Sequence, residues 1–300
     1  MRKFFTNVWR VITFPFRLIF NIIACPFRLF ARFRRYLNAE PEEHPLADVL
    51  TGLVTDKSMR DFLWEEIDIF RKHLLRAVLS VVIGIGIAFI FAPQLVSFLA
   101  IPIGGISKLE AIEVTEPIGV YMNVSLLAGI ALASPYIAFE FWWFAAPGLR
   151  PRERRYGLFG IPMAAIFFIA GLAFTYYIML PGALPWLLNI LGFQTKLRPS
   201  SYFSFVTGLM FWIGVAFEYP LVIYFLTAMG FIKPKVLSQY WRQAVVIISI
   251  IAAVITPTWD PVNMGLVMLP MILLYFVSMG LSYLAYAGRR THETPTASKE

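Results

Sequence analysis

Long apolar runs dominate this 300-residue sequence and constrain its fold more than any other feature. A helix needs about 20 mainly apolar residues to cross the hydrocarbon core of a bilayer, and most of the runs reach that length. They lie at 74–100, 118–144, 156–180, 202–229, 244–256 and 262–287. The fifth is much shorter than the others and would form about 20 Å of helix. We therefore expect an all-α integral membrane protein with six transmembrane helices.

The composition excludes several classes of protein. Hydrophobic residues make up 59% of the chain and charged residues 15%, which is too apolar for an ordinary soluble domain of this size. The net charge of +8 does not indicate nucleic-acid binding, because most basic residues flank apolar runs. The single cysteine, Cys25, excludes an intramolecular disulfide, and His44, His73 and His292 are far apart in the sequence. We expect neither a metal site nor a cofactor.

The distribution of basic residues predicts the orientation of the helices. Basic residues are frequent before the first apolar run, in the segments 145–155 and 230–243, and in the C-terminal tail. The loops on the other side carry only Lys108, Lys196 and Arg198. Because cytoplasmic loops are rich in Lys and Arg, we expect both termini to be cytoplasmic.

Residues 1–37 are basic and aromatic and contain a short repeat. Pro15-Phe16-Arg17-Leu18 recurs 11 residues later as Pro26-Phe27-Arg28-Leu29, a spacing close to three helical turns. The basic side chains would share one face of a helix that lies in the membrane interface and binds anionic lipids. A signal peptide is the alternative, but Arg17 interrupts the apolar stretch and no small-residue cleavage site follows.

The remaining segments complete the expected organisation. A polar linker is expected at 38–60, the six-helix core at 61–287 and a polar cytoplasmic tail at 288–300. Residues 61–72 should form a helical entry into the first spanning segment, and Pro102 with Gly104-Gly105 should break the far end of that segment.

Glu218 is the most unusual polar residue of the apolar runs. It lies in the middle of the fourth run, where an ionised carboxylate costs several kcal/mol. One interpretation is a neutral glutamate that hydrogen-bonds a neighbouring helix. The alternative is a polar floor of a cavity that handles substrate or protons. Pro220, two residues later, frees a backbone carbonyl and could bend the helix there.

Three further acids lie at the edges of the apolar runs. Glu140 stands beside Trp142 and Trp143, so it is either a side chain that reaches the membrane interface or a functional residue. Glu153 follows a turn at Pro147-Gly148 and is surrounded by arginines, so a salt bridge within the loop is the simplest interpretation. Asp260 lies between two prolines, where a turn or capping role is the default.

These features together resemble the TatC family, the polytopic receptor subunit of the twin-arginine protein translocase. The resemblance covers about residues 62–287 and depends on several motifs in order. They are Ser134-Pro135, Phe144-x-x-Pro147-Gly148-Leu149, Glu153-Arg154-Arg155, Phe217-Glu218-x-Pro220, Thr256-Pro257-x-x-Asp260, and Pro270 in the last helix.

The resemblance implies a function that the residues alone do not supply. Members of this family bind the paired arginines of signal peptides on folded precursors, and they use the proton-motive force rather than enzymatic chemistry. Glu153 would be the arginine partner, because a carboxylate accepts the forked donors of a guanidinium. Glu218, with Phe217, Pro220 and Glu140, would line the concave face of a glove-shaped bundle with short fifth and sixth helices. The implied partners are single-span TatA/TatB-type subunits and further copies of the chain, in a bacterial or archaeal cytoplasmic membrane.

The entry helix departs from the family pattern His-Leu-x-Glu-Leu-Arg-x-Arg. The aligned run here begins at Glu66 and ends at His73, so the acid of the pattern corresponds to Ile69 and its first arginine to Arg71. Glu65 and Glu66 lie four and three residues before Ile69, on the same side of a helix, and either could substitute. Asp68 points about 100° away from Ile69. Other departures are Gly119 and Asn123 in place of an acid and a lysine, and Trp259 in place of a proline.

Two alternative functions remain open at this point. A proton-coupled small-molecule transporter would use Glu218 as its carrier and would not need Glu153. A degenerate family member would act as an assembly scaffold and bind partner subunits without binding signal peptides, which the missing acid at position 69 favours.

Overall fold

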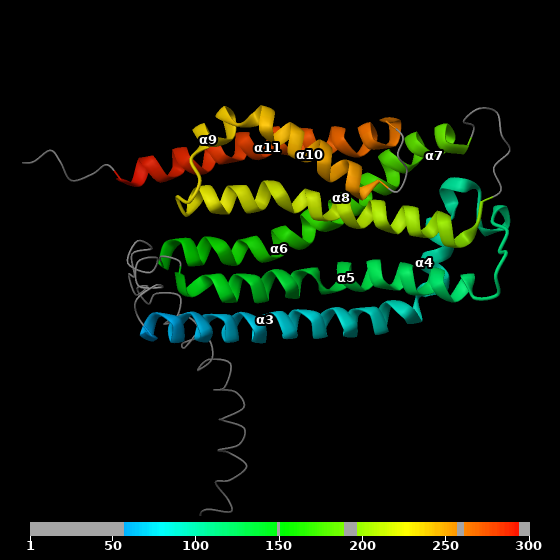
Figure 1. Cartoon of the computed structure of the whole chain (residues 1–300), viewed down its shortest axis with the longest axis horizontal. Helices are drawn as coiled ribbons and strands as arrows, with labels where there is room; N and C mark the ends of the chain where they lie inside the picture. Colours follow the sequence, from blue (N-terminus) through cyan, green and yellow to red (C-terminus); the bar gives the residue numbers. More distant parts are fainter. Residues whose placement is uncertain (1–56, 149–150, 189–196, 257–260, 294–300) are drawn as a thin grey trace, which may run out of the picture.

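The computed structural model describes residues 57–148, 151–188, 197–256 and 261–293 (Figure 1). The α-helices of these residues are α3 (Lys57–Ile90), α4 (Ala92–Leu99), α5 (Glu116–Ala145), α6 (Pro151–Phe174), α7 (Leu180–Leu188), α8 (Pro199–Ala228), α9 (Pro234–Gln239), α10 (Trp241–Ile255) and α11 (Pro261–Glu293). The N-terminal extension at 1–37, most of the expected linker and residues 294–300 lie outside the described part of the chain.

Five of these helices are long and apolar enough to cross a membrane. Their apolar segments are Trp64–Ile90, Glu116–Ala145, Gly157–Trp186, Pro199–Ala228 and Asn263–Ala287. The fifth expected segment is α10, a shorter apolar helix of 15 residues that measures about 22 Å. The all-α membrane fold is thus confirmed, with five long helices and one short one in the positions that the apolar runs indicate.

The expectation of a short sixth helix is wrong. Helix α11 has 33 residues, and its apolar segment Asn263–Ala287 has 25, which is enough to cross a bilayer. Pro270 lies inside α11 without ending it. The apolar run continues past this proline, and neighbouring helices and local adjustments can accommodate the freed backbone groups of a membrane helix.

Three expected boundaries also differ from the structure. Helix α3 already includes residues 57–60, which the sequence predicts as part of the linker, and α11 continues to Glu293, into the expected tail. The first spanning segment ends at Ile90 instead of near residue 100. Phe91 interrupts it, and α4 begins with Pro93 in its first turn, a position where proline fits a new helix.

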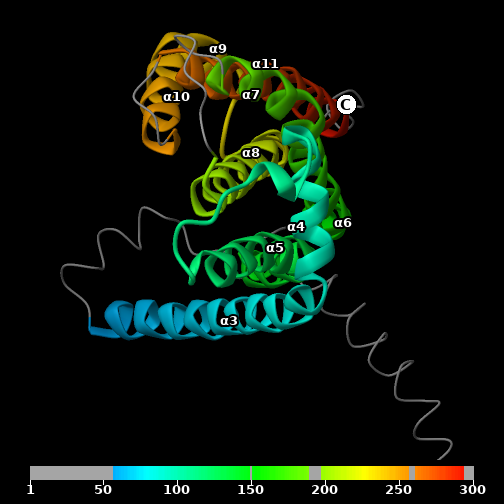
Figure 2. The ribbon, with the colours of Figure 1, turned by 90° about the vertical axis from the view of Figure 1, so that its right-hand side faces the viewer.

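The long helices form a curved row in which each packs mainly against its neighbours (Figure 2). The row runs from α3 through α5 and α8 to α11, with α10 on α11, while α6 packs against both α5 and α8. Glycines allow the closest approaches. A Cβ atom on Gly129 of α5 would lie 2.5 Å from the backbone nitrogen of Ile85 on α3, and one on Gly171 of α6 would lie 2.7 Å from the Cα of Gly214 on α8. The backbones themselves are in contact at these crossings.

One end of the row is held together by polar contacts between distant segments. This end, on the right in Figure 1, carries α4 and the start of α8, and we call it the α4 end. The hydroxyls of Tyr176 and Tyr202 donate to the carbonyl oxygens of Phe98 and Leu99, each at 2.8 Å. These bonds satisfy the last carbonyls of α4, which have no partner within the helix.

An ion pair and a backbone bridge close the same end. The Arg198 guanidinium lies 2.5 Å from Oε1 of the buried Glu116 and 3.1 Å from Oε1 of the exposed Glu113. The hydrogen bond to the Glu116 carboxylate raises the pKa of Arg198 above its ordinary value. Leu109 and Leu197 form an isolated parallel bridge. The loop between α4 and α5 is therefore joined to the start of α8.

A π-helix of five residues, Thr175–Met179, joins α6 to α7. The hydroxyl of Thr175 donates to the Gly171 carbonyl at 2.9 Å. A π-helix has i→i+5 hydrogen bonds, so it accommodates an additional residue within a continuous helix. Tyr176 lies in this segment, and its ring stacks on Phe98 with 4.5 Å between centroids.

Candidate functional site at the α5–α6 turn

The turn between α5 and α6 is closed by a buried arginine. After α5 ends at Ala145, a short 3-10 helix (Ala146–Gly148) contains Pro147, and α6 begins at Pro151. Arg154 is only 2% exposed. Its Nε atom donates to the carbonyl of Ala146 at 2.7 Å, and a terminal nitrogen reaches the carbonyl of Pro147. These carbonyls follow the end of α5, so Arg154 satisfies backbone groups that the helix leaves open.

Glu153 is held on this closed turn, in the first turn of α6. Its side chain lies outside the described atoms, so the expected loop salt bridge stays untested. The two residues that follow differ sharply: Arg154 is buried and Arg155 is exposed. The structural role of Arg154 was not predicted from the sequence, because four arginines in one loop look equivalent until the fold buries one of them.

Close packing between α5 and α6 supports the same turn. A Cβ atom on Gly157 would lie 2.5 Å from Nε1 of Trp142, so this glycine is needed for the indole to fit. Trp142 is buried at 6% exposure. Its ring lies inside the bundle instead of anchoring α5 in the membrane interface, which is the usual role of an aromatic residue at this depth.

Glu140 forms an ion pair with the entry helix. Its Oε2 lies 2.6 Å from Nδ1 of His73 on α3, and the two side chains are 4% and 11% exposed. Tyr136 also hydrogen-bonds the carboxylate, and Arg76 contributes a nearby positive charge. Glu140 therefore faces a neighbouring helix and does not extend to the membrane interface. The carboxylate of Glu140 is already paired with His73 inside the bundle. A contact of Glu140 with a partner subunit remains a prediction.

Sequence reasoning missed His73, although a signal was present. His73 aligns with the last arginine of the entry-helix pattern, so it keeps a position where a cation is usual. Its partner is 67 residues away in the sequence, and only the packing of α3 on α5 brings the two together.

The acids of the entry helix lie at the same end of the bundle as Glu153. Glu65, Glu66 and Arg71 are all exposed near the start of α3. Figure 1 shows the start of α3, the end of α5 and the start of α6 together on the left. We call this the turn end. The structure therefore brings the entry helix and the turn that carries Glu153 to one end of the row.

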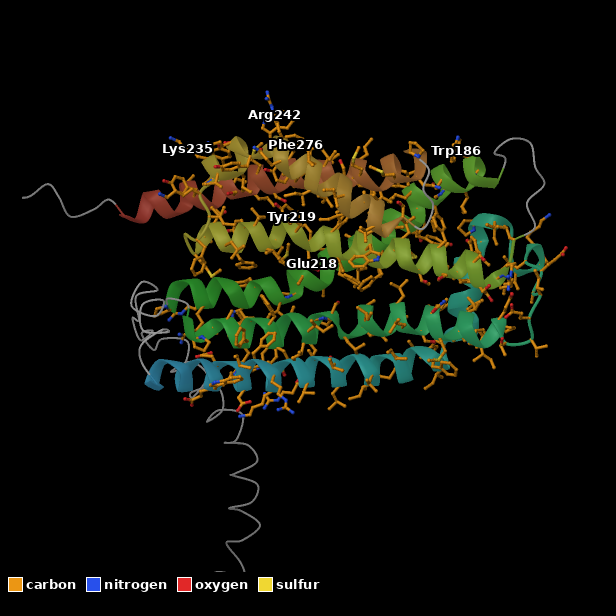
Figure 3. All side chains as sticks on the ribbon, viewed as in Figure 1. Trp186, Glu218, Tyr219, Lys235, Arg242 and Phe276 are labelled. Atoms are coloured by element: carbon orange, nitrogen blue, oxygen red, sulfur yellow. The ribbon has the colours of Figure 1, made fainter. Side chains whose placement is uncertain are left out.

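Glu218 belongs to a second, separate region in the middle of the row. It is partly buried on α8 and interacts with the backbone of Phe168 on α6. Figure 3 places it between these two helices. Phe217 packs against Phe174 with 5.5 Å between ring centroids. Pro220 is buried inside α8, which continues through it.

The other expected motif residues are spread over the fold. Pro102 lies in a 3-10 helix at the α4 end, Pro135 is inside α5, and Gly148 ends the short helix of the turn. Pro257 and Asp260 lie outside the described residues. Among the described residues, no three His, Cys, Asp or Glu side chains come together in a group that could hold a metal ion.

Comparison with known proteins assigns the chain to a family. The family model described as "Sec-independent protein translocase protein (TatC)" matches residues 65–270. The chain belongs to the TatC family. The match begins at the entry-helix acids and ends at Pro270, so it includes both regions described above. TatC proteins are components of a protein translocase and not enzymes.

Individual relatives and solved structures agree with this assignment. A TatC protein of Deinococcus radiodurans is 36% identical over 229 residues, which cover 73% of this chain and 85% of the relative. A TatC protein of Aquifex aeolicus is 36% identical over 231 residues, covering 74% and 95%. A crystal structure titled as the twin-arginine translocase receptor TatC superposes with a TM-score of 0.65 at 33% identity, covering 73% of this chain and 99% of that one. None of these comparisons supports the small-molecule transporter or the degenerate scaffold.

Proposed function

We propose that this TatC protein is the signal-peptide receptor and core scaffold of a twin-arginine translocase in a bacterial cytoplasmic membrane. The observation that carries the proposal is the convergence at the turn end. Exposed acids of α3 lie at the same end of the bundle as Glu153, whose turn is closed by the buried Arg154. This arrangement supports a rigid site for a cationic segment that arrives from the aqueous side.

The paired arginines of a signal peptide are suited to such a site. A guanidinium presents a planar fork of donors that a carboxylate can accept in two parallel bonds, whereas a lysine ammonium acts as a point charge. Glu153 would bind one arginine, and an acid of α3, Glu65 or Glu66, would bind the other. Arg71 lies on the same helix and would contact the signal peptide.

Glu218 would serve the later steps of transport. Its place between α6 and α8, inside a curved row, suits contact with the apolar part of the signal peptide or with single-span TatA/TatB-type subunits. Further copies of the chain would join the complex, and the proton-motive force would supply the energy. Both termini would be cytoplasmic, and the basic residues 1–37 would bind anionic lipids.

Site-specific photocrosslinking tests the receptor function. A crosslinker at position 153 of the full chain in membrane vesicles would be offered a twin-arginine signal peptide, and in parallel the same peptide with both arginines changed to lysine. We expect crosslinks to the first peptide and not to the second. Equal crosslinking of both peptides would contradict the receptor function. The absence of crosslinks to either peptide, in a preparation in which partner subunits still copurify, would contradict it as well.

A further inference from the structure

The face that α3 turns toward α5 continues past the end of α5. Phe70, His73 and Gly84 contact α5, through Phe144 at 5.2 Å between ring centroids, through Glu140, and through the close approach to Gly129. At about 100° per residue, these three positions lie within roughly 60° of one another on the helix. The spacing continues toward the start of α3 at position 66, which lies four residues before Phe70 and seven before His73.

This geometry distinguishes the two candidate acids. Glu66 lies at the centre of the α5-facing side of α3, whereas Glu65 points about 100° away from it. Helix α5 runs antiparallel to α3 and ends one residue after Phe144. Glu66 is therefore one turn beyond the last helical contact, level with the α5–α6 turn. This explains why Glu66 is exposed although it continues a packed face.

Contacts with α5 set the direction in which this part of α3 points. They include the crossing at Gly84 and Gly129, the contact of Phe70 with Phe144, and the His73–Glu140 pair, which is polar and lies about 16 Å nearer the turn end than the crossing. Glu66 lies about 27 Å from the crossing along the helix. If the contacts near the turn end were loosened, a tilt of about 10° at the crossing would move Glu66 by roughly 5 Å, more than a hydrogen bond tolerates.

We propose that Glu66 is the second arginine-binding carboxylate of this TatC protein and that the His73–Glu140 pair is its positioning device. The site thus replaces the acid missing at Ile69 with one that is three residues earlier and is held in place by an ion pair to α5. The inference rests on the proposed receptor function. Glu65 then has no part in arginine recognition.

The test compares variants of the full chain in lipid nanodiscs, with a fluorescent twin-arginine signal peptide and its lysine counterpart as probes. We expect Glu66→Gln to weaken binding of the arginine peptide by about tenfold or more, because one charge-assisted hydrogen-bond pair is lost. Glu65→Gln, which changes the competing candidate, should weaken binding much less. Asp68→Asn is the matched control, because it removes an exposed acid on the opposite side of α3, and it should stay within about twofold of the unmodified chain. The reverse order would overturn the assignment of Glu66.

The role of His73 is tested through its coupling to Glu66. His73→Leu removes the contact and should weaken binding of the arginine peptide, while His73→Asn keeps a donor at similar reach and should restore most of it. In the Glu66→Gln background, His73→Leu should have no further effect, because it acts through Glu66. Additive losses in the double variant would mean that the pair only stabilises the fold.

The outcomes separate this inference from the function on which it rests. If the unmodified chain does not prefer the arginine peptide over the lysine peptide, the receptor function fails and the inference fails with it. If that preference is present but does not depend on Glu66, only the inference is overturned.

Discussion

Gly84 and Gly129 place the backbones of α3 and α5 in direct contact, because a Cβ atom on Gly84 would lie 2.5 Å from the carbonyl oxygen of Gly129. The atoms that it would meet belong to the backbone and cannot rotate away. In a bilayer no hydrophobic driving force brings helices together, so they associate through close packing. Small residues permit the closest approach. The position of the entry helix therefore depends on these two residues.

Replacing Gly129 by alanine should separate the two helices. We expect Gly129→Ala to lower the free energy of unfolding by about 1–3 kcal/mol, as overpacking does in a well-packed interior. Thermal unfolding of the purified protein in detergent measures the effect. Gly86→Ala is the matched control, because a Cβ atom at Gly86 would meet nothing within 4 Å. An unchanged unfolding midpoint in Gly129→Ala would mean that α3 does not pack as described.

Removing the arginine that closes the α5–α6 turn should affect binding as well as stability. Arg154→Gln leaves the carbonyls of Ala146 and Pro147 without their charged donor, and we expect a loss of about 1–3 kcal/mol in the free energy of unfolding. Crosslinking of a twin-arginine peptide from position 153 should fall as well. The exposed neighbour Arg155, changed to Gln, should lower the unfolding midpoint and the crosslink far less than Arg154→Gln does. Full crosslinking in Arg154→Gln would show that the turn does not need this residue.

The ion pair at the α4 end should stabilise the fold through its buried acid. Arg198→Gln leaves Glu116 buried with no cation, so it should lower the unfolding midpoint more than Glu113→Gln, which removes only the exposed partner. The double variant Arg198→Gln with Glu116→Gln should recover part of the loss. Equal effects of Arg198→Gln and Glu113→Gln would contradict this division of roles.

The tyrosine bonds to α4 provide a more conservative test of the same end. Tyr202→Phe removes only the hydroxyl that donates to the Leu99 carbonyl, and we expect a loss of about 1 kcal/mol in the free energy of unfolding. Tyr177→Phe is the control, since Tyr177 is 67% exposed. Chemical denaturation in mixed micelles would measure the difference, and a Tyr202→Phe protein as stable as the control would contradict the prediction.

A change at Glu218 should separate peptide binding from assembly. We expect Glu218→Gln to leave crosslinking from position 153 intact, because this glutamate lies in the middle of the row and away from the turn end (Figure 3). Copurification of single-span partner subunits and transport of a folded precursor should both decrease. The opposite pattern, with lost crosslinking and intact copurification, would assign Glu218 to the initial binding step.

The sequence predicts the helices well and their contacts poorly, for a physical reason. Bilayer thickness requires apolar runs of a fixed length, so the long helices and the short α10 can be recognised one segment at a time. Glu218 was detectable by the same rule, as a charge inside an apolar run. The His73–Glu140 pair and the burial of Arg154 depend on which helices become neighbours, and no local pattern encodes that. The sequence does not reveal the break at Phe91, because apolar residues continue on both sides of it.

The π-helix between α6 and α7 determines where this helical segment can lose a residue. It accommodates a surplus residue within a continuous helix. A deletion of one residue within Thr175–Met179 could restore α-helical register without breaking the segment. Residues on both sides of the deletion would then keep their positions, because the surplus residue is absorbed within the π-helix. A deletion within α6 itself would instead rotate the following residues by about 100°, and the ring of Tyr176 would move away from Phe98. The π-helix is therefore a place where this segment can lose a residue and keep its contacts.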